Sequence, residues 1–257
     1  MNKNKLEIYK GSFTAFTIKG ISIISGYMFS FLIALYYGAQ GIGVFSISQT
    51  LISILAIFSI LGFDVAIVRF FSEEKSIIRT KAIYFKILKI IILLALSISI
   101  LIYSSSSLLV DFFGDKDLLY SIKYASLGIL PLSLLFINAE GLRGMKEIKL
   151  YSIFKYAMIP LISSIILLIM YNSKFLYLES VIISYVAGIY ITFVFSMFFW
   201  LNRINVSSSN ENTVSFKSLL SVALPMLLTT SLFHVINWTD TIILGYYDTS
   251  YNIGIYN

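Results

Sequence analysis

The side chains that could do chemistry are few in this chain, and most of them stand inside or at the ends of long apolar blocks. The sequence has no cysteine and one histidine, so disulfides, cysteine nucleophiles and the usual zinc sites are not expected. Ionisable side chains are costly inside a membrane and usually face a bundle interior or water, where they mark a substrate or ion path. We therefore expect binding or coupling roles for them, and neither an enzyme nor a cofactor or metal site.

Lys19 lies within the first apolar block. The same block carries small residues at four-residue spacing, namely Ser22, Gly26, Ser30, Ala34 and Gly38. At 3.6 residues per turn they form a nearly straight stripe, which permits a close helix approach or forms a cavity wall. Lys19 projects from the same helix face as this stripe. We therefore interpret it as a cation in a cavity or, alternatively, as a lysine that snorkels to the lipid headgroups.

Charged residues also stand near the ends of later blocks. Asp64 and Arg69 are five residues apart and do not share a helix face, so Arg69 is either a ligand for an anion or a membrane anchor. Glu140 and Arg143 are spaced i, i+3, which allows an ion pair that either latches a gate or merely ends a helix. Lys123, close to two tyrosines, is either an exit-side cation or an interfacial anchor.

Two further groups are candidates for coupling and hydrogen bonding. His234, Asn237 and Asp240 are spaced i, i+3, i+6 in the last apolar block, as a coupling site or a cavity lining would be. The alternative is that neighbouring helices satisfy these polar groups. Gln49 shares a helix face with two serines and either binds a ligand or packs between helices.

Long apolar blocks must position all of these residues. Hydrophobic residues make up 58% of the chain and charged residues 12%, whereas a soluble domain carries about 25% charged residues. Each block can cross a hydrocarbon core of about 30 Å as a helix and is too uniformly apolar for a barrel strand. The sequence therefore predicts an all-α, polytopic membrane helix bundle. The predicted spans are residues 12–37, 44–66, 83–103, 118–139, 150–171, 176–201 and 217–246.

Lysine and arginine gather in alternate links between these spans. They are frequent before the first span and around residues 67–82, 140–149 and 202–216, and sparse in the other links. The positive-inside rule places the N-terminus and the basic links in the cytoplasm. Because the net charge of +6 sits at the block edges, it indicates membrane orientation rather than nucleic-acid binding. The longest link on the other side, 104–117, carries three aspartates, too few and too unstructured to indicate catalysis.

All three prolines, Pro131, Pro160 and Pro225, lie inside predicted spans. A proline removes a helix hydrogen bond and kinks the chain, which transporters use at their working sites. Proline is also simply common in membrane helices, so a hinge and a plain kink both stay open.

The first and last blocks end in similar sequences, LIALYYGAQGIGVFS (32–46) and TIILGYYDTSYNIGIYN (241–257). Because both blocks run in the same predicted direction, the similarity indicates a parallel repeat. We expect a six-span lobe in residues 1–201, a cytoplasmic linker in 202–216 and the start of a second lobe in 217–257, from a protein of about twelve spans. Asp240 matches Ser30 in the repeat and is expected to face the first lobe.

Four stretches carry a resemblance to a known family: GAQGIGVFS (38–46), GFDVAIVRFFS (62–72), AEGLRGMKEIKLY (139–151) and the last 18 residues, DTIILGYYDTSYNIGIYN. In this order, the chain resembles the O-antigen and capsule repeat-unit flippases of the multidrug/oligosaccharidyl-lipid/polysaccharide exporter superfamily. The resemblance implies two six-helix lobes that rock around a cationic cavity. It implies a cargo of undecaprenyl-pyrophosphate-linked oligosaccharide, moved across the bacterial inner membrane from the cytoplasmic to the outer leaflet.

The sequence leaves two other functions open. A cation-coupled multidrug exporter of the same superfamily shares the lobes but favours acidic groups in the cavity. A membrane glycan polymerase or glycosyltransferase usually has a large outer loop with catalytic residues. The expected partners are the lipid-linked oligosaccharide and membrane lipids, with the polysaccharide polymerase and chain-length machinery as further candidates.

Overall fold

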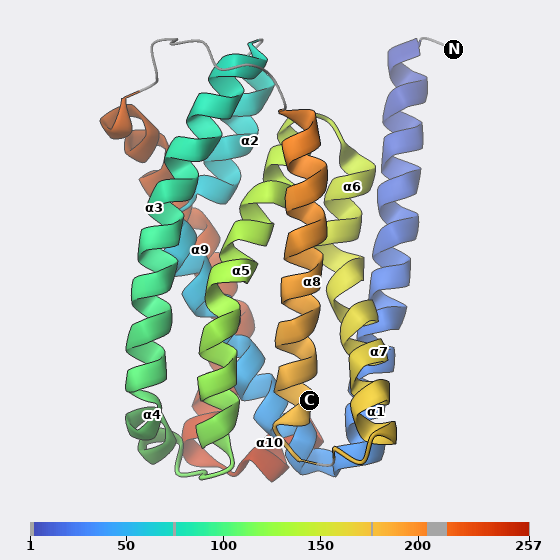
Figure 1. Cartoon of the computed structure of the whole chain (residues 1–257), viewed down its shortest axis with the longest axis vertical. Coiled ribbons are helices and arrows are strands. Elements are labelled where there is room, and N and C mark those ends of the chain that lie inside the picture. The colour runs from blue at the N-terminus through green and yellow to red at the C-terminus, as the bar shows by residue number, and fades with distance from the viewer. Residues whose placement is uncertain (1–2, 74–75, 176, 205–214, 257) are drawn as a thin grey trace.

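The chain folds into a bundle of long helices in a computed structural model (Figure 1). The structure describes residues 3–73, 76–175, 177–204 and 215–256, without the side chains of residues 3–10, 230, 233–235 and 237. Within these ranges every regular element is helical, which confirms the predicted fold class. The elements are α1 (Lys3–Ile60), α2 (Phe63–Glu73), α3 (Ile77–Ser104), α4 (Ser106–Phe113), α5 (Leu118–Gly144), α6 (Ile148–Ser152), the π-helix η1 (Ile153–Ala157), α7 (Met158–Asn172), α8 (Ser180–Arg203), α9 (Phe216–Tyr247) and α10 (Ser250–Tyr256).

The chain is a multi-pass membrane protein. Five helical stretches in the described ranges are long and apolar enough to cross a membrane, and the first of them, Gly11–Ile60, has 50 residues. At 1.5 Å per residue it would be about 75 Å long if straight, more than twice the thickness of a hydrocarbon core. Figure 1 shows that α1 instead descends, turns at the end of the bundle opposite the N-terminus and ascends again. It therefore supplies two of the predicted spans.

The turn in α1 is made at Gly38, whose backbone has φ 64° and ψ −163°. A side chain makes this conformation costly, so glycine is required there. The predicted link at 38–43 thus contains the turn and is otherwise helical. Gln40, two residues after the turn, donates its side-chain amide to Asp117 at 2.9 Å and to Asp115 at 3.3 Å.

The link 104–117 is also more ordered than expected, because α4 occupies most of it. Gly114 ends this helix in the left-handed conformation. Asp115 and Asp117 then meet the turn of α1 through Gln40. These two aspartates therefore fasten two links together at one end of the bundle.

The helix ends next to the basic links lie at one end of the bundle. Figure 1 places the start of α1, the end of α2 with the start of α3, the end of α5 with the start of α6, and the end of α8 together, and α10 at the opposite end. The alternation predicted from lysine and arginine thus matches the way the helices run. At the far end, the Asn252 side chain and the Thr249 backbone N–H both donate to Asp248, and these bonds hold the pKa of its carboxyl below the usual value.

Helix α5 lies at the centre of the bundle and is the most buried span. Buried polar groups hold it to its neighbours: Tyr84 of α3 donates to the Asn138 side-chain oxygen at 2.6 Å, and the Asn138 amide donates to Ser196 of α8 at 3.1 Å. Such fully satisfied networks specify one arrangement of helices, because an unpaired polar group is costly in an apolar interior.

Two of the helix prolines leave a backbone carbonyl free, and a neighbouring helix donates a hydrogen bond to each. Pro131 lacks the N–H that would bond the Leu127 carbonyl four residues earlier, and the Tyr190 hydroxyl of α8 donates to that carbonyl at 3.1 Å. Pro160 frees the Tyr156 carbonyl in the same way, and Ser22 of α1 donates to it at 2.7 Å. Neighbouring hydroxyls thus satisfy the freed carbonyls, as membrane helices require.

Candidate functional site

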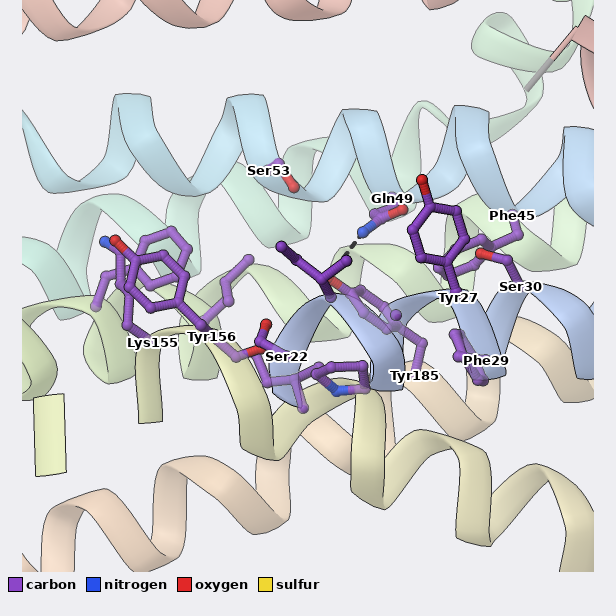
Figure 2. Close-up of a pocket in the computed structure, with 16 residues that line it drawn as sticks. Ser22, Tyr27, Phe29, Ser30, Phe45, Gln49, Ser53, Lys155, Tyr156 and Tyr185 are labelled. Carbon is purple, nitrogen blue, oxygen red and sulfur yellow. Dashed lines mark hydrogen bonds between the residues drawn. The ribbon is translucent and has the colours of Figure 1, made fainter. Parts of the chain in front are cut away.

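A cavity of about 540 Å³ lies between α1, α5, η1, α7 and α8 (Figure 2). This volume is within the range of ordinary ligand sites. The lining combines hydroxyl, amide and aromatic groups with apolar side chains. Its members are Ser22, Ile23, Gly26, Tyr27, Phe29, Ser30, Phe45, Gln49, Ser53, Leu132, Phe136, Lys155, Tyr156, Ile159, Pro160 and Tyr185.

Both arms of α1 contribute to the cavity wall. Ser22, Gly26 and Ser30 of the predicted small-residue stripe line it from the first arm. Gln49 and Ser53 line it from the second arm, and Gln49 donates to the Tyr185 hydroxyl at a long 3.4 Å. Ser22, Gly26 and Ser30 therefore form part of a cavity wall, which is one of the two interpretations of the stripe. The turn at Gly38 explains how one helix can supply both sides.

Lys155 is the one charged side chain among the described residues that line the cavity. Its side chain is 18% exposed, and its Nζ lies 3.2 Å from Oε1 of Glu140. The ammonium also lies 4.0 Å from the ring centre of Phe136, within the range of a cation–π contact. The cavity therefore presents a cation held between a carboxylate and an aromatic face.

The π-helix η1 carries Lys155 and its neighbour Tyr156 to the cavity. Its wider turn is closed by the bond from the Met158 N–H to the Ile153 carbonyl. Such insertions in membrane and soluble helices are frequent at functional sites. Here the wider turn coincides with the Tyr156 carbonyl that Ser22 binds, so the helix irregularity and the cavity wall are one feature.

The predicted pair of Glu140 and Arg143 forms, with Arg143 Nε 2.8 Å from Glu140 Oε2. Glu140 is buried behind the cavity wall and contacts a cation with each oxygen. Arg143 also stacks over Tyr151, whose hydroxyl lies 3.1 Å from that of Tyr156. A connected polar cluster thus runs from the end of α5 to the cavity.

Lys19 lies at the rim of this cluster rather than in the cavity lining. It is exposed, and its Nζ is 5.8 Å from the ring centre of Tyr156. The structure thus places the cavity cation on η1 and gives Lys19 an outer position beside it.

Three other predicted residues lie away from the cavity. Arg69 is exposed and forms an ion pair with Glu73 at 3.0 Å. Asp64 is half-buried in the first turn of α2. Lys123 lies about 6 Å from the ring centres of Tyr103 and Tyr120, an arrangement that suits an interfacial anchor.

The predicted cluster in the last span is only partly described. The side chains of His234 and Asn237 lie outside the described residues. Asp240 is exposed and accepts a bond from the Thr241 N–H, whereas Trp238 and Ile242 face the second arm of α1 across a small apolar gap. The expectation that Asp240 faces the first lobe is therefore wrong, because the neighbouring apolar side chains take that side of α9.

Lys155, Tyr156 and Tyr185 are the site residues that sequence reasoning missed. Lys155 lies at the start of the predicted span 150–171, close to Lys146 and Lys149 of a basic link, and so resembles a further membrane-edge lysine. One signal could have separated it: it lies inside an apolar span, five residues before Pro160. The tyrosines had no such signal, since the chain has 18 of them.

A family model described as polysaccharide biosynthesis protein matches residues 8–257, nearly the whole chain. No curated protein and no solved structure matches it.

Proposed function

The chain belongs to the polysaccharide biosynthesis protein family, and from this membership we propose that it is part of a flippase for lipid-linked oligosaccharides. The cargo is an undecaprenyl-pyrophosphate-linked repeat unit, which moves from the cytoplasmic to the outer leaflet of the bacterial inner membrane for surface polysaccharide synthesis. Two lobes give alternating access to the cavity, and the basic end of the bundle with the N-terminus lies in the cytoplasm.

One observation carries this proposal: a cavity within the membrane bundle has Lys155 as its cation and hydroxyl, amide and aromatic groups around it. A lysine is a point charge that suits phosphate, and hydroxyls, amides and ring faces suit sugars. A lipid-linked oligosaccharide has both parts, which are too polar to cross the hydrocarbon core without such a path.

The two alternatives receive less support. An exporter of cationic compounds needs an anionic group in the cavity, and among the described lining residues the charged one is a lysine. A polymerase or glycosyltransferase usually has a large outer loop with catalytic residues, whereas α4 fills most of the link 104–117, and Asp115 and Asp117 accept bonds from Gln40. We therefore propose that the protein is a transporter, not an enzyme, and that a polymerase and chain-length machinery use its product.

A cellular test compares Lys155→Met with Lys149→Met in the full-length natural protein, in cells that depend on it for surface polysaccharide. Lys149 is exposed on α6 at the same end of the bundle, so it controls for the loss of one positive charge. We expect Lys155→Met to abolish surface polysaccharide and Lys149→Met to preserve it. Normal polysaccharide with Lys155→Met would contradict the proposal.

A further inference from the structure

We propose that Glu140 is a resident counter-anion of the cavity, which the cargo must displace from Lys155 in order to bind. This inference rests on the proposed function and names the anion that the cargo displaces at the same site. The exchange admits a lipid headgroup with two negative charges and disfavours headgroups with one or none.

The geometry places the carboxylate where such an exchange can occur. Lys155 lines the cavity, whereas Glu140 reaches it from behind, on the centrally placed α5. Only about a twentieth of Glu140 is exposed, so its charge depends on the two cations beside it. An anion that enters the cavity meets Lys155 in the cavity wall and competes with Glu140 for the same ammonium.

Arg143 can keep Glu140 neutralised after the exchange. Its Nε lies 2.8 Å from Glu140 Oε2, yet these two buried atoms lack an aligned hydrogen bond. Both therefore retain bonding capacity that a small rotation of the carboxylate would use. The fork of an arginine also favours a carboxylate that presents both oxygens to it. Lys155, with its flexible stem, is then free for the cargo.

The charge balance sets how much charge a headgroup needs to displace Glu140 with a gain in free energy. One carboxylate and two cations leave a net charge of +1, because Glu140 neutralises one of the two positive charges in the empty state. A phosphodiester puts one negative charge in place of another beside Lys155, so the free energy of the exchange is close to zero. A diphosphate diester brings two, and at equal distance the attraction scales with the charge. The cavity thus favours a diphosphate-linked lipid over the single-charge phospholipids that surround it in far greater number.

The test measures binding of two probes to the full-length natural protein in detergent. The probes are farnesyl diphospho-N-acetylglucosamine and farnesyl phospho-N-acetylglucosamine, which differ by one phosphate. The variant combines Glu140→Gln with Arg143→Gln, which removes the counter-anion and leaves the net charge unchanged. A matched control, Glu147→Gln with Arg203→Gln, removes another ion pair, 2.7 Å long, from the same end of the bundle.

We expect the Glu140/Arg143 variant to bind the monophosphate probe roughly tenfold more tightly than the wild type, the effect of one displaced ion pair. The diphosphate probe should gain by a similar factor, and the control pair should change neither affinity. An unchanged monophosphate affinity in the Glu140/Arg143 variant would overturn the exchange.

A second variant covers the case in which that protein does not fold. Glu140→Asp keeps all three charges but shortens the carboxylate, which weakens its reach to Lys155. We expect a smaller rise in monophosphate affinity, and no rise would again count against the exchange. The proposed function fails separately: in that case the wild type binds neither probe, or Lys155→Met leaves the diphosphate affinity intact.

Discussion

Gly43 of α1 and Gly254 of α10 occupy matching places in the sequence repeat, and each packs against the backbone of the other's helix. A Cβ at Gly43 would collide with the Ser250 carbonyl, and a Cβ at Gly254 would collide with the Ala39 carbonyl. Ser250 and Ala39 also match in the repeat, so the two contacts are related by exchange of the two copies. Such close approach through small residues is typical of membrane helix crossings and allows Cα–H···O contacts.

Substitution of either glycine should therefore destabilise the protein. We expect Gly43→Ala and Gly254→Ala each to cost about 1–3 kcal/mol, because the added methyl forces the helices apart. Thermal unfolding in detergent measures the effect. Gly20→Ala in the same α1 helix is the control, since nothing lies within 4 Å of its Cβ position. Equal unfolding temperatures for all three variants would contradict the close crossing.

The Ser22 hydroxyl should contribute to the free energy of unfolding mainly because Pro160 is present. Ser22→Ala leaves the Tyr156 carbonyl without its partner inside an apolar span and should cost about 1–3 kcal/mol. In a Pro160→Ala background the backbone N–H restored at position 160 can bond that carbonyl, so the same change should cost much less. A double-mutant cycle in unfolding free energy gives the difference directly. Additive effects would show that the hydroxyl and the proline are independent.

Tyr84 and Asn138 should stabilise the protein through the one hydrogen bond that they share, so the effects of replacing them should not add. Asn138→Leu leaves the buried Tyr84 hydroxyl without its 2.6 Å partner and should destabilise the bundle by about 1–3 kcal/mol. In a Tyr84→Phe background, where the hydroxyl is already gone, the further cost should be smaller. The prediction fails if Asn138→Leu costs the same in the wild-type and the Tyr84→Phe backgrounds.

The two ends of the cavity should bind different parts of the cargo. Figure 2 shows Lys155 and Tyr156 at one end and Gln49, Tyr185 and Ser30 toward the other. We expect Gln49→Leu to lower the affinity for a diphosphate-linked oligosaccharide about 2- to 10-fold, the effect of one lost hydrogen bond. The affinity for the bare polyprenyl diphosphate should stay the same. A parallel loss for both ligands would place Gln49 at the phosphate instead.

Helix positions could be predicted from the sequence because long apolar blocks leave a chain few other choices. The alternation of basic links was equally readable, since it depends on charge counts rather than on contacts. The sequence did not predict where the helices break. Gly38 turns α1 within one residue, and α4 forms in a link that was expected to be unstructured.

The site was predicted only where it depended on periodicity. The stripe of Ser22, Gly26 and Ser30 lines the cavity because four-residue spacing alone puts the three on one helix face. Lys155 was hidden because its role depends on η1 and on Glu140 of another helix, and neither follows from local spacing. Gly43 and Gly254 were visible as a repeat, but only the structure shows that they meet.

The transfer of a lipid-linked oligosaccharide between leaflets tests the central claim most directly. The full-length natural protein is reconstituted in vesicles with a fluorescent polyprenyl-diphosphate-linked oligosaccharide, and an impermeant quencher reports how fast the label changes leaflet. We predict rapid transfer by the wild type and by Lys149→Met, and a rate at least about tenfold lower with Lys155→Met. Equal rates for the wild type and Lys155→Met, or no transfer above protein-free vesicles, would contradict the account.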